Sequence, residues 1–211
     1  ILLLFANFLG LFGASPDTIL VAETMETDRA HIAIISGHAG FDSGAICEDD
    51  EGQFLLQEVD VVARIASIAA ESLQASGHDV TVLDEYDPSL EGLQADVLIS
   101  LHADSCTDAS GYKVAYYEKS TIPVTNDRLL ECVNQHYASA TEMVLDADTI
   151  TPDMTEYHAF RKIDAQTPAA ILELGYLGGD GLLLLGNPEV PASGVVDSLL
   201  CFLDSAATES P

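Results

Sequence analysis

The chain has 211 residues, of which 48% are hydrophobic, and this is enough apolar material for one domain with a substantial core. Seven Lys and Arg stand against 35 Asp and Glu, so the formal net charge is −28 at pH 7. Because nucleic acids and anionic membrane surfaces both attract cationic proteins, this balance argues against either as a partner.

The N-terminal 28 residues differ from the rest of the chain. Residues 1–16 carry no charge, and they are fewer than the roughly 20 residues that cross a bilayer as a helix. We interpret 1–28 as the remnant of a signal peptide or membrane anchor plus a linker, which favours an exported protein. The alternative is an apolar strand or helix packed on the domain. One folded domain is expected over 29–207, followed by a tail at 208–211.

Short apolar runs then alternate with segments of helical period. Strands are predicted at 31–36, 79–83, 96–101, 112–117, 155–163 and 169–174. Helices are predicted at 54–76, at 126–137 and from 187 to about 203. Continuous apolar strands separated by helices indicate a sheet that is covered on both faces. We therefore predict a single α/β domain, with a mostly parallel twisted sheet of about six strands flanked by helices on both faces.

Two polar residues early in the chain break this apolar pattern. His38 follows strand 31–36 in a glycine-flanked turn, from which an imidazole can project at the end of the strand. An incidental turn histidine is the alternative. Glu58 lies on or beside the apolar stripe of helix 54–76, where an ionised carboxylate is costly without a partner. A first-turn Glu that faces outward and is stabilised by the helix dipole is the alternative.

A second histidine follows the apolar run 96–101. His102 therefore lies at the carboxyl end of a strand, where α/β sheets bind their ligands. Asp104, two residues later, could hold the tautomer of this imidazole, or it could be a surface turn residue.

A carboxylate interrupts the most apolar strand. Glu173 lies within 169–174, which otherwise is typical of a fully buried strand. A buried carboxylate without a nearby cation has a raised pKa, which suits proton transfer. The alternative is a salt bridge from Glu173 to Arg161.

These four residues together are more informative than any one of them. Two His and one Glu with an open fourth position form a known catalytic zinc arrangement, in which another Glu serves as general base. The pattern therefore predicts a zinc site formed by the two histidines and one of the two glutamates, with the other glutamate as the base.

The same residues lie in segments that resemble a known family. In chain order the segments are SGHAGFDSGA, LLQEVDVVARIA, ADVLISLHADS, ASGYKVAYY and PAAILELGYL. They resemble the zinc-dependent N-acetylmuramoyl-L-alanine amidases, which cleave bacterial cell-wall peptidoglycan, and the resemblance covers about residues 30–203. It implies one Zn²⁺ ion bound by His38, Glu58 and His102, and Glu173 as the catalytic base. It also implies a mostly parallel sheet flanked by helices.

The resemblance further implies where the protein works and what it acts on. The substrate is expected to be peptidoglycan, cleaved at the amide bond between N-acetylmuramic acid and L-alanine. We expect a monomer that acts outside the cytoplasm as a secreted, periplasmic or membrane-anchored protein.

Some positions depart from the family pattern. Many members carry an Arg shortly before the strand of the second histidine, but segment 90–95 has none. No Arg follows strand 79–83 either, where 83–86 reads Leu-Asp-Glu-Tyr. At 178–180 the sequence reads Gly-Gly-Asp where many members have Ser-Asn. None of these changes removes a metal ligand, so they bear on substrate fit rather than on catalysis.

Three further expectations concern His158 and the cysteines. His158 precedes the Glu173 strand and could reach the groove as a substrate or oxyanion contact; a hydrogen-bonded structural histidine is the alternative. Cys47 and Cys106 each follow a metal-ligand loop, and these loops could bring them within disulfide range; metal-adjacent thiols are the alternative. Cys132 and Cys201 lie in apolar-periodic segments and are expected as buried thiols.

Three other functions are compatible with parts of the sequence. One is a zinc hydrolase of a different amide, such as a carboxypeptidase, although those usually keep His and Glu only a few residues apart. Another is an inactive wall-binding module of the same fold. The third is a Cys–His nucleophile pair that uses Cys106.

Overall fold

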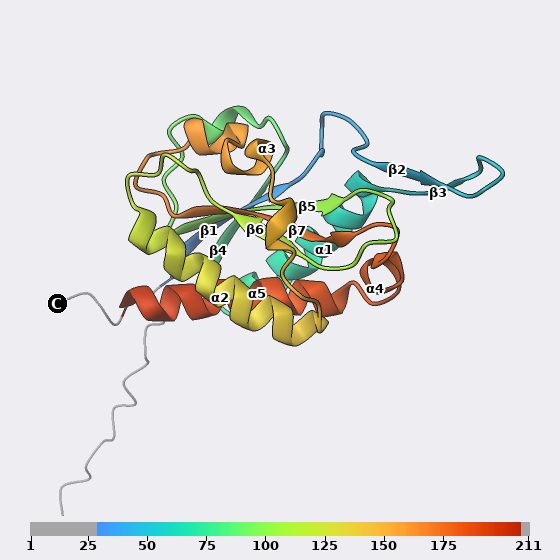
Figure 1. The fold of residues 1–211 in the computed structure, drawn as a ribbon. Coiled ribbons are helices and arrows are strands. Elements are labelled where there is room, and N and C mark those ends of the chain that lie inside the picture. The colour runs from blue at the N-terminus through green and yellow to red at the C-terminus, as the bar shows by residue number, and fades with distance from the viewer. Residues whose placement is uncertain (1–28, 208–211) are drawn as a thin grey trace, which may run out of the picture.

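A five-stranded sheet forms the centre of the computed structural model, which describes residues 29–207 (Figure 1). Its strand order is β4-β1-β5-β7-β6, and only β6 runs antiparallel to its neighbour. The strands are β1 (His31–Ser36), β4 (Asp79–Leu83), β5 (Val97–Asp104), β6 (Lys113–Ala115) and β7 (Ala169–Tyr176). The predicted α/β class and mostly parallel sheet are confirmed. The expectations for 1–28 and 208–211 lie outside the described residues.

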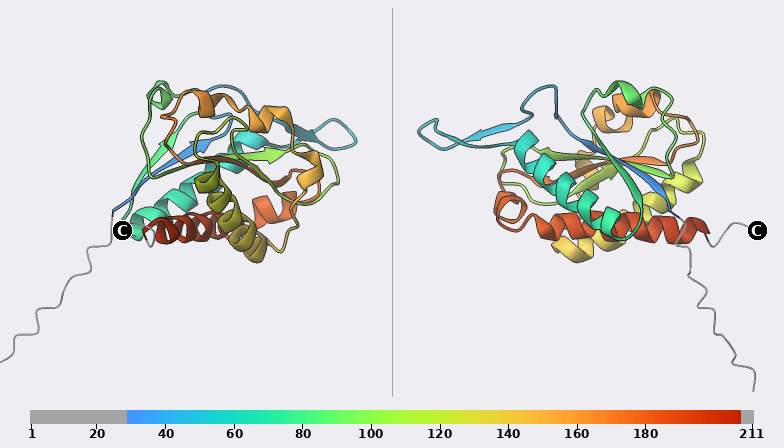
Figure 2. Two further views of the ribbon diagram at one scale, coloured as in Figure 1. Left: turned by 60° about the vertical axis from the view of Figure 1, so that its left-hand side comes forward. Right: turned by 180° about the vertical axis from the view of Figure 1, so that it is seen from behind.

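Three long helices cover one face of this sheet (Figures 1 and 2). They are α1 (Glu58–Ala75), α2 (Pro123–Thr141) and α5 (Glu189–Ala207). The side chains of β1 alternate between the two faces, so Ile32 and Ile34 pack with these helices while Ala33 and Ile35 pack on the other side. The larger apolar core therefore lies between the sheet and the three helices.

Short helical segments cover the opposite face. They are η1 (Pro88–Leu90), α3 (Pro152–Thr155) and η3 (His158–Arg161), with η2 (Ala147–Thr149) nearby in the chain. The strand predicted at 155–163 is therefore wrong, and the sheet has five strands rather than about six. Met154, Tyr157 and Phe160 recur every three residues, a spacing that places them on one side of consecutive helical turns facing the sheet.

A hairpin extends from the body of the domain (Figures 1 and 2). It consists of β2 (Ile46–Glu48) and β3 (Phe54–Gln57), which pair antiparallel. The predicted helix at 54–76 therefore begins four residues later than expected, because residues 54–57 pair with β2 instead of continuing the helix. This boundary makes Glu58 the first residue of α1.

A disulfide joins the two helices that pack most extensively against each other. Cys132 on α2 and Cys201 on α5 are bonded, with their Cα atoms 5.8 Å apart. The expectation of two buried thiols is thus wrong, because the apolar faces of α2 and α5 bring the two sulfur atoms together. None of the helices in the described part of the chain combines the length and apolarity needed to cross a bilayer.

Candidate metal centre

His38 leaves the end of β1 in an unusual backbone conformation. Its φ is +66°, which is uncommon for a residue with a side chain. Gly37 before it allows β1 and β5 to approach, since a Cβ there would lie 2.6 Å from the ring of His102. The pKa of His38 is raised, chiefly by its contact with the Glu58 carboxylate. The two predicted histidines are therefore brought close together, with ring centroids 4.9 Å apart.

Glu58 lies between the two histidines. Its Oε1 atom is 3.1 Å from His38 Nε2 and 3.1 Å from His102 Nδ1, and it accepts the backbone N–H of Ala103. Its Oε2 atom accepts the backbone N–H of Ala45. Burial raises the pKa of Glu58, but the hydrogen bonds from His102 and His38 outweigh it and bring the pKa to about 2. The outward-facing alternative is therefore excluded.

His102 lies near the end of β5 and is 7% exposed. Its Nδ1 atom faces Glu58, and its Nε2 atom lies 3.3 Å from Oε2 of Glu85. Burial lowers the pKa of His102, but its contacts with Glu58 and Glu85 outweigh burial and raise it to about 10. The second imidazole thus lies between two carboxylates, with one nitrogen facing each.

These three side chains can hold a metal ion. One donor atom from each of His38, Glu58 and His102 lies within 4.8 Å of the other two. In each histidine, the ring nitrogen that faces away from Glu58 lies close to another carboxylate. For His38 this is Asp42, whose Oδ1 atom is 2.5 Å from the ring, and for His102 it is Glu85. Metal-binding histidines commonly have this arrangement, in which the outer carboxylate orients the ring. The donor set of two imidazoles and one carboxylate fits a catalytic zinc ion.

Glu173 lies beside this cluster on β7. It is the register partner of His102 on β5, and both residues line a cavity of about 400 Å³ together with His38 and Glu58. Its Oε2 atom is buried and has no hydrogen-bond partner among residues 29–207. Burial is the main cause that raises the pKa of Glu173 to about 7. A carboxyl group in this state is suited to accept a proton.

The alternative salt bridge to Glu173 does not form. Arg161 is exposed, and its Nη1 atom lies 3.6 Å from Oε2 of Glu156. Lys113 on β6 is the register partner of Glu173 on the side away from His102. The Lys113 ammonium pairs with Asp104 and lies 4.9 Å from the centre of the Tyr176 ring.

Asp104 is a half-buried residue at the end of β5, so neither interpretation of it, as the group that orients His102 or as a surface turn residue, is correct. Asp104 pairs with Lys113 instead, and Glu85 is the carboxylate that faces the outer nitrogen of His102. Sequence reasoning missed Glu85 as a site residue. Its position two residues after β4 was the available signal, because β4 neighbours β1 and both strands end at the same edge of the sheet.

His158 is not among the residues that line the cavity. Its Nε2 atom is 2.8 Å from Oε1 of Glu85, and its ring stacks on Tyr86 with centroids 4.2 Å apart. The structure thus places His158 in a hydrogen-bonded position that supports Glu85.

Cys47 and Cys106 form a disulfide, with their Cα atoms 5.5 Å apart. The bond joins the β2–β3 hairpin to the loop that follows β5. His102 lies within β5, a few residues before this loop. Because no described cysteine is a free thiol, the alternative of a Cys106 nucleophile is excluded.

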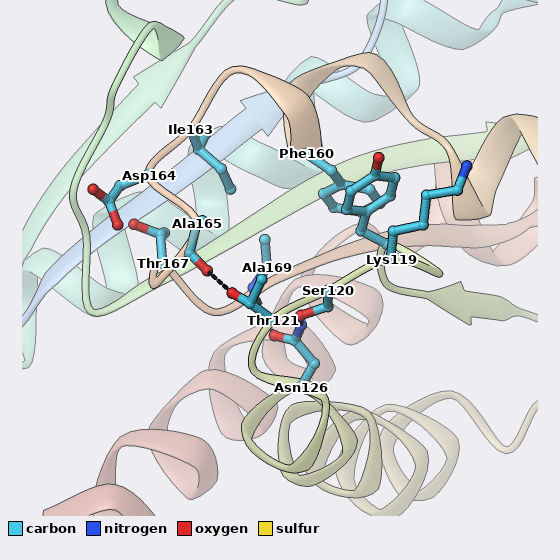
Figure 3. A pocket seen from close by; sticks show the side chains of 11 residues that line it. Lys119, Ser120, Thr121, Asn126, Phe160, Ile163, Asp164, Ala165, Thr167 and Ala169 are labelled. Carbon is cyan, nitrogen blue, oxygen red and sulfur yellow. Dashed lines mark hydrogen bonds between the residues drawn. The ribbon is translucent and has the colours of Figure 1, made fainter.

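A second, smaller cavity of about 130 Å³ lies near the start of β7 (Figure 3). The Thr121 hydroxyl donates to the Ala165 carbonyl at its side, at 3.1 Å. Its lining contains none of His38, Glu58, His102 and Glu173. The chemistry described above therefore belongs to the larger cavity at the carboxyl edge of the sheet.

The fold and this cluster define an α/β enzyme with a candidate metal centre. The family model for N-acetylmuramoyl-L-alanine amidases matches residues 32–180. The chain belongs to the N-acetylmuramoyl-L-alanine amidase family. This membership supports an amidase activity on peptidoglycan. No curated protein matches the sequence.

Solved structures with the same fold include several amidases. The CwlD amidase from Clostridioides difficile, in complex with the GerS lipoprotein, has a TM-score of 0.64 at 16% identity, covering 84% of this chain and 100% of that chain. An N-acetylmuramoyl-L-alanine amidase from Clostridium difficile 630 also has a TM-score of 0.64, at 21% identity, covering 85% and 99%. For Ami1 from Mycobacterium smegmatis the TM-score is 0.63 at 16% identity, covering 83% and 97%. At these identities the likeness establishes the fold.

Proposed function

We propose that the chain hydrolyses the amide bond between N-acetylmuramic acid and L-alanine in peptidoglycan, with one zinc ion held by His38, Glu58 and His102. The observation that carries the proposal is the shared cavity: the three donor residues and the buried carboxylate of Glu173 line it together. Family membership supplies the substrate class.

A zinc ion bound there would supply Lewis acidity to the attacking water and to the amide carbonyl. The protein's own part begins with the two imidazoles, whose outer nitrogens face Asp42 and Glu85. Glu58 adds negative charge at the centre of the donor set, and backbone N–H groups of Ala45 and Ala103 hold its two oxygens in place.

Glu173 is the general base in this proposal. It takes a proton from the attacking water and returns it to the amine of L-alanine as the amide bond breaks. Its buried Oε2 atom has no competing partner in the described chain, so this oxygen is available to the water. A pKa of about 7 lets the carboxyl accept and release the proton near neutrality.

We also propose that the chain works outside the cytoplasm as a monomer, with 29–207 as its catalytic domain. The substrate of the family lies in the cell wall, and the two disulfides suit an oxidising compartment. The alternatives of another amide substrate or an inactive wall-binding module lack a comparable observation in their favour.

Product analysis tests this function directly. Purified muropeptides are incubated with the protein, with and without a zinc chelator, and the products are identified by mass spectrometry. We expect glycan chains with free muramic acid and peptides that begin with L-alanine, both abolished by the chelator and restored by zinc. New peptide termini at another bond would assign a different substrate, and absence of cleavage by the zinc-loaded protein would contradict an enzymatic role.

A further inference from the structure

Glu85 is a buried carboxylate that contacts both histidines of the candidate metal centre. It follows β4, and it is 5% exposed. Its Oε2 atom accepts the backbone N–H of His38 at 2.9 Å and lies 3.3 Å from Nε2 of His102. The Glu85 side chain therefore contacts the backbone of His38 and the ring of His102.

The contact with His38 supports a strained backbone. A residue with a side chain at a φ of +66° has a conformational cost, and such a residue persists where its surroundings hold it. The Glu85 carboxylate accepts the N–H of this residue, and the Glu85 N–H in turn donates to the carbonyl of Ala39 at 3.0 Å. This pair of hydrogen bonds ties the His38 turn to the segment after β4.

The contact with His102 favours one tautomer of its ring. Nδ1 faces Glu58 at 3.1 Å, so this nitrogen must be unprotonated when it binds a metal ion. The proton then lies on Nε2, which faces Glu85. A carboxylate at this position favours the Nε2–H tautomer and fixes the rotation of the ring.

The other oxygen of Glu85 is held in place by two further donors. The Tyr157 hydroxyl donates to Oε1 at 2.8 Å, and His158 Nε2 lies 2.8 Å from the same atom. The Tyr157 hydroxyl also accepts from the Ser100 hydroxyl at 3.0 Å, which fixes its direction. Both oxygens of the Glu85 carboxylate therefore face hydrogen-bond donors. A glutamine at position 85 would replace one oxygen by an NH₂ group, which is itself a donor and would face another donor.

We propose that Glu85 is the positioning residue of the metal centre: its carboxylate fixes the backbone of His38 and the ring of His102 so that both imidazoles face Glu58. This inference rests on the proposed function, because it assumes that the cluster binds zinc. Glu85 does not line the cavity, so its effect passes through the two histidines.

The test compares E85Q with a matched control. Asp84→Asn removes the same charge from the adjacent residue, whose side chain is exposed. Zinc affinity is measured by competition with a chromogenic chelator, and the visible spectrum of the cobalt(II)-loaded protein reports ligand geometry. We expect E85Q to bind zinc about 10 to 100 times more weakly than the wild type and to change the cobalt bands. The control should match the wild type in both measurements.

Equal zinc affinity and identical cobalt spectra for folded E85Q and wild type would overturn the proposal. If circular dichroism shows that E85Q does not fold, the same titrations are made on E85D, which keeps a carboxylate but withdraws it from His102. Weaker zinc binding by folded E85D supports the proposal, and wild-type affinity contradicts it. Failure of the wild type itself to bind zinc would instead refute the proposed function, so the two failures are distinguishable.

Discussion

His102 and Glu173 are register partners on the adjacent parallel strands β5 and β7. Their side chains therefore lie on the same face of the sheet, on strands separated by about 4.8 Å. This pairing places the proposed base beside a proposed zinc ligand on rigid secondary structure rather than on a loop. The pairing of β5 with β7 thus determines how far the proposed base lies from the proposed zinc ligand.

Glu173→Gln tests the base. The variant keeps the size of the side chain but cannot accept the proton, so we expect turnover of muropeptides to fall by about 10² to 10⁴ while zinc stays bound. Glu131→Gln, on the exposed side of α2, is the control and should keep wild-type turnover. Turnover by Glu173→Gln close to that of the control would remove Glu173 from this role.

The pH dependence of activity follows from the same residue. The raised pKa of Glu173, about 7, means that its carboxyl becomes protonated as the pH falls through this value, and a protonated carboxyl cannot act as a base. Because a bound cation lowers the pKa of a nearby acid, the midpoint in the zinc-loaded enzyme is expected at or below about 7. The profile of kcat/KM against pH measures it, and constant activity down to pH 4 would contradict the prediction.

Zinc should stabilise the protein against unfolding. A ligand that binds only the folded state adds a stability of RT ln(1 + [L]/Kd), or about 2.7 kcal/mol at a free concentration of 100 times Kd. We therefore expect chelation to lower the melting temperature and added zinc to restore it. His38→Ala should melt at the same temperature with and without zinc, and a zinc-dependent shift in that variant would argue for another binding site.

The metal-free protein should lose stability in acid through Glu58. Its pKa is lowered to about 2 in the folded state, from an ordinary value of 4.5. The stabilisation is therefore present above pH 4.5 and is lost as the pH falls from there through about 2. Urea unfolding of the chelated protein across this range measures the loss, and Glu58→Gln should show a smaller decrease. An equal decrease in both proteins would assign the acid sensitivity to other carboxylates.

Replacing Cys132 and Cys201 together by Ser should destabilise the fold without changing the chemistry. The disulfide closes a sequence separation of 69 residues, and loss of such a link costs roughly 2 to 5 kcal/mol. Denaturant unfolding gives this difference, and the zinc affinity of the folded variant should equal that of the wild type. A large loss of zinc affinity would show that the packing of α2 on α5 also shapes the metal centre.

The position of the site was largely predictable from sequence, because three of its residues lie at or near the ends of apolar strands. His38, His102 and Glu173 interrupt or follow buried runs, and parallel strands bring such positions to one edge of the sheet. The sequence leaves open whether Glu58 faces the site or the solvent, since helical period alone does not reveal that the residues before it pair as a strand.

The remaining features depend on contacts between segments that are distant in the chain. The role of Glu85 follows from β4 lying next to β1, which strand propensity does not reveal. The Cys132–Cys201 bond requires α2 and α5 to be neighbours. The segment 155–163 was misread because its apolar residues suit a strand as well as short helical turns, and packing against the sheet decides between them.

The metal content of the purified protein is the most direct test of the candidate metal centre. Elemental analysis of the wild type and of His102→Ala, both checked for folding by circular dichroism, should give one zinc per wild-type chain and almost none in the variant. Equal zinc in the two proteins, or a folded wild type that takes up no zinc even when it is supplied, would contradict a metal centre formed by His38, Glu58 and His102.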